Sequence, residues 1–263
     1  MRELWQIDAF TGEAFRGNPA AVVFLDDWPG DRWLQDVAAE MNLSETAYLV
    51  PDDDDGSWHL RWFTPTTEVD LCGHATLASA WALSESGRLR NGAARFRTRS
   101  GELKAVARGD AFELDFPSTP PEVADPLEEL LESLGVEAVW FGRTRFDHFV
   151  VVEGEETVRS LVPDLRRLER SSSRGVIVTA RGNSEEVDFV SRFFAPAVGV
   201  EEDPVTGSAH CALGPYWADR LSREDLAARQ LSPRGGSIRV RVRGDRVGLE
   251  GDAVTVLRGE LLV

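Results

Sequence analysis

The chain has 263 residues, of which 42% are hydrophobic and 28% charged, and its formal net charge is −16. This composition is typical of a soluble globular protein, and the length fits one large domain or two of about 120 residues. So acidic a surface argues against nucleic acid and anionic membranes as partners. The sequence contains no apolar run of about 18 residues, and its start, "MRELWQIDAF", lacks signal-peptide features. We therefore expect a cytoplasmic protein.

In chain order, "DRWLQDVAAEMN" (31–42) predicts a helix that opens on an Asp cap. "PDDDDGS" (51–57) predicts a hairpin loop with solvated acidic residues. "DFPSTPPEVADP" (115–126) predicts a linker because its four prolines cannot continue a helix or a strand ladder. "DPLEELLESLG" (125–135) predicts a helix that closes on glycine. Alternation with period two predicts strands in "WHLRWFTP" and in the segment from residue 237 to the end.

The sequence also repeats itself. "RWFTPTTEVDLCGHATLASAWAL" begins at Arg61, and "RFFAPAVGVEEDPVTGSAHCAL" begins at Arg192. Both run from an arginine through two aromatic residues, a proline and an acidic stretch to a glycine and a helical run. A fainter pair, "GNPAAVVFL" and "FDHFVVVEG", precedes them. A period above 100 residues indicates two similar domains rather than a solenoid. We therefore expect two halves, 1–117 and 118–263, with a last strand that is able to cross back to the first half.

Several cofactor classes are disfavoured by the residues present. Lys104 is the only lysine and lies in a strand-like segment, which argues against a pyridoxal phosphate Schiff base. Cys72 and Cys211 are too few for a disulfide framework. The four histidines show no zinc-ligand spacing with these cysteines. We expect neither a metal nor an organic cofactor.

Each repeat places a glycine, Gly73 or Gly207, where a strand turns into a helix. The first N–H groups of a helix have no internal partner and lie at the positive end of the helix dipole, so they bind carboxylate or phosphate well. His74 flanks the first turn, and Asp203 and Ser208 flank the second. A plain glycine turn without a ligand is the alternative interpretation of each.

Glu45 lies in "MNLSETAYLV", between a predicted helix end and an apolar strand. Partial burial at such a place would raise the pKa of a carboxyl group and suit it to general acid or base chemistry. The local pattern alone favours a capping or surface role for Glu45, and it leaves His74 open between capping and catalysis.

Four segments together resemble the PhzF family of phenazine biosynthesis, within the diaminopimelate epimerase-like fold. They are "DAFTGEAFRGNPAAVV", "MNLSETAYLV", "FTPTTEVDLCGHATLASAWAL" and "EEDPVTGSAHCALGPYW", and they match in order and spacing over most of the chain. The resemblance implies an α+β fold of two pseudo-symmetric halves, each a mixed β-sheet wrapped around a central α-helix, with the active site between them. It also suggests a homodimer.

The resemblance further implies Glu45 as the catalytic base, with His74 and Asp203 as the other catalytic residues. The implied substrate-binding residues are Ser44, Gly73, Gly207 and Ser208. The PhzF enzyme isomerises trans-2,3-dihydro-3-hydroxyanthranilate without a cofactor by moving a proton. We therefore expect a cofactor-independent isomerase that transfers a proton on a small carboxylate substrate by general acid–base catalysis.

Two alternatives remain. Diaminopimelate epimerases use two facing cysteines; Cys72 occupies the first of these positions, but Thr206 occupies the second, and Cys211 lies about one helical turn deeper. A two-thiol racemase is therefore disfavoured, whereas an amino-acid racemase or epimerase that uses Glu45 with another acid stays open. The second alternative is a non-catalytic small-molecule binding protein, which would bind carboxylates without exchanging a proton.

Overall fold

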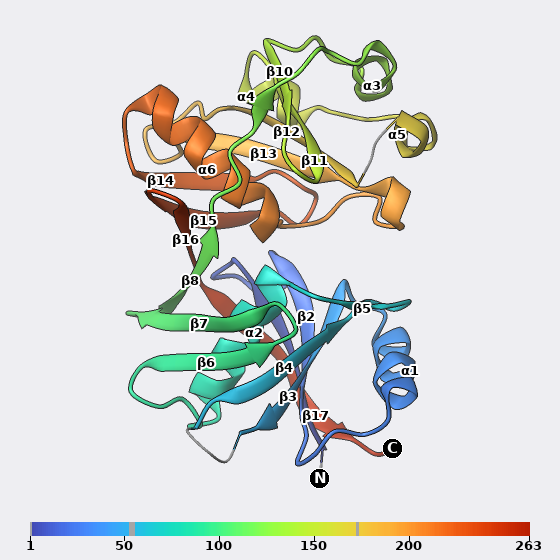
Figure 1. Ribbon diagram of the computed structural model, residues 1–263, viewed down its shortest axis with the longest axis vertical. Coiled ribbons are helices and arrows are strands. Elements are labelled where there is room, and N and C mark those ends of the chain that lie inside the picture. The colour runs from blue at the N-terminus through green and yellow to red at the C-terminus, as the bar shows by residue number, and fades with distance from the viewer. Residues whose placement is uncertain (1, 53–55, 172–173) are drawn as a thin grey trace. The chain divides into compact units, whose positions relative to one another are not determined.

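The computed structural model describes residues 2–52, 56–171 and 174–263. The chain forms two compact units (Figure 1): residues 1–115 with 250–263 make the first, and residues 116–249 make the second. The last strand, β17 (Ala253–Leu261), pairs antiparallel with β1 (Arg2–Ala9). Both ends of the chain thus contribute to the first unit.

A mixed sheet forms the first unit, with strands in the order β17, β1, β2, β3, β4, β6, β7 and β8. The pairs β2–β3 and β4–β6 are parallel, the others are antiparallel, and the short β5 pairs with β4. The remaining bounds are β2 (Asn18–Phe24), β3 (Glu45–Pro51), β4 (Trp58–Phe63), β5 (Glu68–Val69), β6 (Ala93–Thr98), β7 (Gly101–Arg108) and β8 (Ala111–Pro117).

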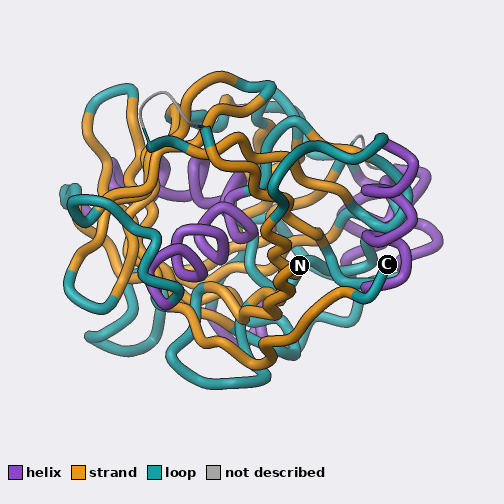
Figure 2. Tube along the Cα trace, turned by 90° about the horizontal axis from the view of Figure 1, so that it is seen from below, coloured by secondary structure: helices purple, strands orange, loops and turns teal. Residues whose placement is uncertain are grey.

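Helix α2 (Gly73–Glu85) is the centre of the first unit. It contacts β1, β2, β3, β6, β7 and β17, and nine of its 13 residues are buried. Figure 2 shows helices in purple among the orange strands. A helix that is apolar on all sides is stable only when it is buried on all sides, which the surrounding sheet provides. The outer helix α1 (Asp31–Met41) buries only one face, through Leu34, Val37 and Ala38.

The second unit repeats this succession of pairings. Strands β10 to β15 pair antiparallel, parallel, antiparallel, parallel and antiparallel in turn, as β1, β2, β3, β4, β6 and β7 do. Its strands are β9 (Glu122–Val123), β10 (Trp140–Arg143), β11 (Asp147–Val151), β12 (Gly175–Arg181), β13 (Phe189–Phe194), β14 (Asp225–Gln230), β15 (Gly236–Arg243) and β16 (Arg246–Gly251). Its helices are α3 (Glu128–Leu134), α4 (Glu155–Arg159), α5 (Leu165–Ser171), the 3-10 turn η1 (Pro196–Val198) and α6 (Gly207–Leu221). The predicted α+β fold of two similar halves with mixed sheets is confirmed.

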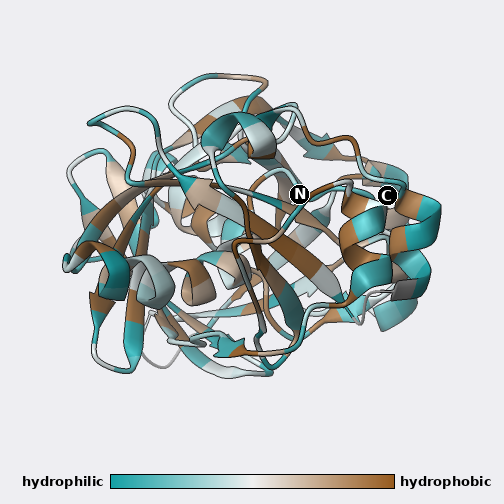
Figure 3. Ribbon diagram, turned by 90° about the horizontal axis from the view of Figure 1, so that it is seen from above, coloured by the Kyte–Doolittle hydropathy of each residue, from teal (hydrophilic) through white to brown (hydrophobic). Residues whose placement is uncertain are grey.

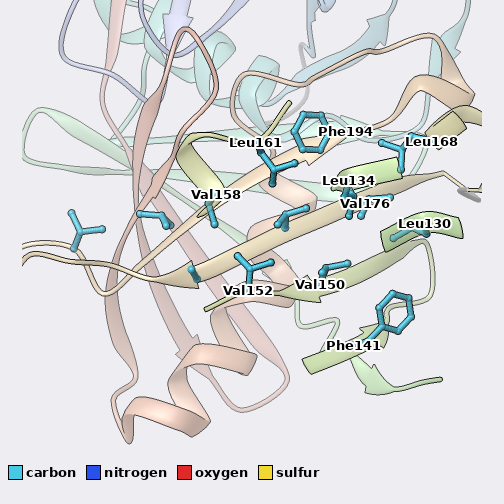
Figure 4. Packing of buried hydrophobic residues seen from close by; sticks show 14 residues of the cluster. Leu130, Leu134, Phe141, Val150, Val152, Val158, Leu161, Leu168, Val176 and Phe194 are labelled. Atoms are coloured by element: carbon cyan, nitrogen blue, oxygen red, sulfur yellow. The ribbon is translucent and has the colours of Figure 1, made fainter. Parts of the chain in front are cut away.

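A cluster of buried hydrophobic side chains packs α3, α4 and α5 against strands β10 to β13 (Figure 4). Leu130 and Leu134 of α3 and Leu168 of α5 lie in it together with Val150 and Val176 from the sheet. In Figure 3, brown apolar residues concentrate on the strands and teal residues in the loops. None of the helices in the described parts of the chain has the length and apolarity needed to cross a membrane.

Two partly buried ion pairs occupy equivalent places in the repeat. Arg61 donates from Nε and Nη2 to Glu68, both at 2.7 Å. Arg192 donates from the same two nitrogens to Glu202, at 2.7 and 2.8 Å. Each arginine opens its copy of the repeated sequence, and each glutamate lies in the acidic stretch. The same contact is therefore kept although the second copy is longer, which supports a duplicated origin.

Three local expectations have different outcomes. The predicted Asp cap of α1 is wrong: Gly30 is the N-cap and Asp31 is the first helical residue, where its carboxylate accepts a hydrogen bond from Arg61 at 2.9 Å. Helix α3 begins at Glu128 rather than at residue 125, but it closes on Gly135 with a φ of 68°, as predicted. Of the predicted loop 51–57, residues 53–55 lie outside the described residues; β3 and β4 pair antiparallel on either side of it.

Replacing Arg192 by methionine should lower the free energy of unfolding by about 3–5 kcal/mol, because Glu202 would lose its partner in a largely buried site. The Arg192 side chain is 10% exposed and also donates to the carbonyl oxygen of Leu161 at 2.6 Å. Arg239→Met is the matched control: Arg239 makes the same two-nitrogen contact with Asp225 but is 55% exposed. The Arg239→Met variant should lose about 1 kcal/mol or less of unfolding free energy. If urea denaturation shows equal losses of unfolding free energy for the two variants, burial does not set the cost of removing the arginine.

Candidate active site

Glu45 is placed by the turn that joins α1 to β3. The helix ends at Asn42, whose φ of 50° is left-handed, and the chain then enters β3 with Glu45 as its first residue. The parallel pairing of β3 with β2 sets Glu45 opposite Ala20. The Glu45 side chain is 18% exposed. The carboxylate therefore lies at a sheet end, partly shielded from water.

His74 is placed by the first turn of α2. Cys72, in extended conformation, is the N-cap, and its carbonyl oxygen accepts hydrogen bonds from the backbone N–H of Thr76 at 3.2 Å and from its hydroxyl at 2.5 Å. Gly73 and His74 then begin the helix. His74 is buried, as is Cys72. The tight strand-to-helix turn thus carries an imidazole and a thiol into the interior.

The imidazole of His74 lies between a carboxylate and a thiol. Its Nε2 is 3.2 Å from Oε2 of Glu45, and its Nδ1 is 3.5 Å from Sγ of Cys72. Among the described residues Nε2 has no hydrogen-bond partner, so its 3.2 Å contact with Glu45 is a close electrostatic approach. Burial lowers the pKa of His74 to about 3, because an imidazolium would lose its hydration there. The ring is therefore neutral near pH 7.

Glu45, Cys72 and His74 could in principle hold a metal ion, because one ligand atom from each lies within 4.8 Å of the others. Thiolate, imidazole and carboxylate are ligands that Zn²⁺ accepts. The carboxylate, however, faces Nε2 and the thiol faces Nδ1. A histidine binds one ion through one ring nitrogen, so this arrangement fits a chain of proton donors and acceptors better than a shared coordination shell.

Ser44 lies directly before Glu45, and its hydroxyl contacts Oδ1 of Asn18 at 3.2 Å. Asn18 is fully buried and is the first residue of β2. The first unit thus brings together four of the predicted residues: Ser44, Glu45, Gly73 and His74. Asn18 was not predicted; its only signal was its place in "GNPAA", just before an apolar strand.

In the second unit, Asp203 is fixed by Thr206 and Gln230. The Thr206 hydroxyl donates to Oδ2 of Asp203 at 2.6 Å, and its N–H donates to Oε1 of Gln230 at 2.9 Å. The Gln230 amide donates to the carbonyl oxygen of Asp203 at 2.7 Å. Thr206 therefore orients a carboxylate at the position where a two-thiol epimerase would have its second cysteine. Cys211 is buried in α6.

Gly207 is the first residue of α6 and is buried, whereas Ser208 is exposed. The Ser208 hydroxyl lies 3.3 Å from Nη2 of Arg174, which forms an ion pair with the buried Asp147. The second unit thus brings together Asp203, Gly207 and Ser208. Arg174 was missed because no motif surrounds it, and Gln230 because it reaches Thr206 only through the parallel pairing of β14 with β13.

The chain matches known proteins over nearly its whole length. The family model described as phenazine biosynthesis-like protein (PhzC-PhzF) covers residues 7–259. An uncharacterized isomerase of Halalkalibacterium halodurans is 51% identical over 262 residues, which is 99% of this chain and 98% of that protein. An uncharacterized isomerase of Pseudomonas aeruginosa is 50% identical over 258 residues, 98% of each. The crystal structure of a PhzF-family phenazine biosynthesis protein from Enterococcus faecalis is 42% identical, with a TM-score of 0.95 over 100% of this chain and 99% of that one.

The buried, neutral state of His74 predicts a pH dependence of stability. Burial holds its pKa at about 3 in the folded chain, against an ordinary 6.5, so between these values only the unfolded chain binds the proton. Stability is therefore full above about pH 6.5 and falls as the pH drops toward 3. His74→Gln should reduce the loss of unfolding free energy between pH 7 and pH 5 by about 2 kcal/mol.

Chemical denaturation at both pH values measures this difference. His210→Gln should give a similar reduction, because burial lowers the pKa of His210 to about 4. A His74→Gln variant that keeps the full wild-type loss between pH 7 and pH 5 would show that His74 is already charged in the folded protein.

Proposed function

Because this chain belongs to the phenazine biosynthesis-like family, we propose that it is a cofactor-independent isomerase that moves a proton between two positions of a small carboxylate substrate. The family and the isomerase names of two relatives support an isomerase or epimerase. The proton-transfer step is supported chiefly by one observation, the 3.2 Å contact between the carboxylate of Glu45 and Nε2 of the buried His74.

In the proposed resting state, His74 is neutral and carries its hydrogen on Nε2, since that nitrogen faces a carboxylate. Nδ1 then accepts a hydrogen bond from the thiol of Cys72. An N–H that faces a carboxylate at 3.2 Å attracts its negative charge. Cys72 and His74 thus prepare Glu45 as a base, and Cys72 acts by positioning the imidazole.

In the proposed reaction, Glu45 accepts a proton from a substrate carbon and becomes a neutral carboxylic acid. The electron pair left on the substrate shifts and moves the double bond. Glu45 then returns the proton to a second carbon, so the enzyme ends in its starting state and no oxidant or reductant is consumed. General acid–base catalysis contributes about 10²–10⁴-fold. Electrostatic stabilisation of the developing negative charge must supply much of the rest.

The residues of the second unit have proposed roles in substrate binding and orientation. Asp203, whose carboxylate is fixed by the Thr206 hydroxyl, would orient polar substituents of the substrate and pass protons to and from them. Ser208 would hold a substrate carboxylate together with N–H groups at the start of α6 near Gly207, and the N–H groups near Gly73 at the start of α2 have the same proposed capacity to bind an anion. Ser44 would contact the substrate beside the base.

Glu45→Gln should lower hydrogen exchange at the substrate carbon by at least about a hundredfold, because the amide keeps the shape of glutamate but cannot accept a proton. Substrates are found by incubating small carboxylates with the wild-type protein in D₂O and detecting deuterium uptake by mass spectrometry. Glu40→Gln, an exposed glutamate in the neighbouring helix α1, is the control and should exchange at the wild-type rate. A Glu45→Gln variant that exchanges as fast as this control is incompatible with Glu45 as the base.

Cys72→Ala should lower the exchange rate by only about tenfold or less, since one neutral hydrogen bond contributes about 0.5–1.5 kcal/mol. Cys72→Ser should lie closer to the wild-type rate, because a hydroxyl also donates to Nδ1 of His74. These variants separate the proposed isomerase from a racemase that uses the thiol as an acid. If Cys72→Ala and Cys72→Ser fold normally but are both as inactive as Glu45→Gln, then Cys72 itself transfers the proton.

A further inference from the structure

Arg174 occupies in the second unit the place that Ser44 occupies in the first. Each residue directly precedes a strand, β12 or β3, that runs parallel to its neighbour. The Ser44 hydroxyl contacts Asn18, the first residue of β2. The Arg174 guanidinium contacts Asp147, the first residue of β11. Each unit therefore has a polar contact at this strand end, between neutral groups in the first unit and between charged groups in the second. The partners differ by two residues in register, because Glu45 pairs with Ala20 whereas Gly175 pairs with Asp147.

The contact of this strand end with the central helix is repeated as well. In the first unit, Glu45 follows Ser44 and lies 3.2 Å from His74, the second residue of α2. In the second unit, Nη2 of Arg174 lies 3.3 Å from the hydroxyl of Ser208, the second residue of α6. Arg174 thus lies at the strand end that corresponds to Ser44, the residue directly before the proposed base Glu45.

The guanidinium of Arg174 is held in a fixed orientation. Nε donates to the Asp147 carboxylate at 2.8 Å and Nη2 donates to its other oxygen. The Asp147 side chain is only 2% exposed, so an unpaired charge there would be costly and the pair stays formed. The rings of Phe146 and Phe193 lie 5.0 and 5.9 Å from the guanidinium carbon. A cation held on several sides loses little entropy when a ligand binds.

Arg174 also keeps capacity for a ligand. Its side chain is 37% exposed although its partner is buried, and Nη1 makes no hydrogen bond to a described residue. The ion pair with Asp147 uses only Nε and Nη2 of Arg174. The two N–H groups of Nη1 have no role in this ion pair and are available to donate hydrogen bonds to a ligand.

We propose that Arg174 binds the carboxylate of the substrate through Nη1 and thereby selects carboxylates over uncharged analogues. This rests on the small-carboxylate substrate of the proposed function. A net charge of −16 repels anions at long range, so a local, fixed cation would favour carboxylate binding by this acidic protein. Hydrogen bonds between a guanidinium and a carboxylate are about twice as strong as neutral ones.

The test replaces the charged pair by a neutral one. Arg174→Gln alone would leave Asp147 buried and unpaired, so the informative variant is Arg174→Gln with Asp147→Asn, which imitates the neutral Ser44–Asn18 contact of the first unit. Arg181→Gln is the matched control, because Arg181 is an exposed arginine at the other end of β12. Isothermal titration calorimetry then compares a panel of small aminocarboxylates, including 2-aminobenzoate, with their primary amides, after circular dichroism has shown that each variant is folded.

The wild-type protein and the Arg181→Gln control should prefer carboxylates to the matching amides. The double variant should lose about tenfold or more in carboxylate affinity, the strength of one charged hydrogen bond, with unchanged amide affinity. A folded double variant that keeps the carboxylate preference overturns the proposal, as does a wild-type protein that prefers no carboxylate to its amide. Glu45→Gln should retain the preference, so a failure of Glu45 as the base is distinguished from a failure of Arg174 as the anion site.

Discussion

The fold of each unit depends on burying most of one long helix, α2 in the first unit and α6 in the second. Nine of the 13 residues of α2 and nine of the 15 residues of α6 are buried. Polar groups with access to a ligand can then occur only at the ends of such a helix, where backbone N–H groups are also left without internal partners. The sheet end that faces the first turn completes the set. This constraint explains why the acids, bases and hydroxyls of both units gather where a strand begins and a helix starts.

Within that setting, His74 gives the first unit its particular chemistry. Burial keeps the imidazole neutral and lowers its pKa to about 3, and its two ring nitrogens face the thiol of Cys72 and the carboxylate of Glu45. A charged imidazolium beside Glu45 would hold the carboxylate in a tight ion pair and weaken it as a base. A neutral imidazole supports the ionised carboxylate and still leaves it able to accept a proton.

The sequence was sufficient for the fold, because the repeat beginning at Arg61 and Arg192 and the turns at Gly73 and Gly207 are visible as ordered strings of letters. Residues that are brought together by strand register could not be recognised as partners from the sequence. Gln230 reaches Thr206 because β14 pairs parallel with β13, and Arg174 reaches Asp147 because β12 pairs parallel with β11. Parallel pairing over such separations leaves no local pattern. The Asp31 cap failed for another reason: the Arg61 guanidinium takes the carboxylate that would have capped the helix.

The duplication also explains how one fold acquires two different half-sites. The residue before the parallel strand is Ser44 in the first unit, where it contacts the neutral Asn18, and Arg174 in the second, where it forms an ion pair with Asp147. The same second helical position holds His74 in one and Ser208 in the other. The two units differ at these few positions but keep the ion pairs Arg61–Glu68 and Arg192–Glu202. In our proposal, this divergence gives the first unit its proton chemistry and the second unit a fixed cation.

The proposed chemistry depends on a neutral His74 that carries its hydrogen on Nε2, 3.2 Å from the Glu45 carboxylate. Nitrogen-15 NMR of the histidine-labelled protein at pH 7 measures this directly, because the two ring nitrogens report separately on protonation, and a His74→Gln spectrum assigns the signals. We expect one protonated and one unprotonated nitrogen, with the hydrogen on Nε2, throughout pH 5 to 8. A His74 ring protonated on both nitrogens at pH 7, or protonated on Nδ1 alone, would contradict it.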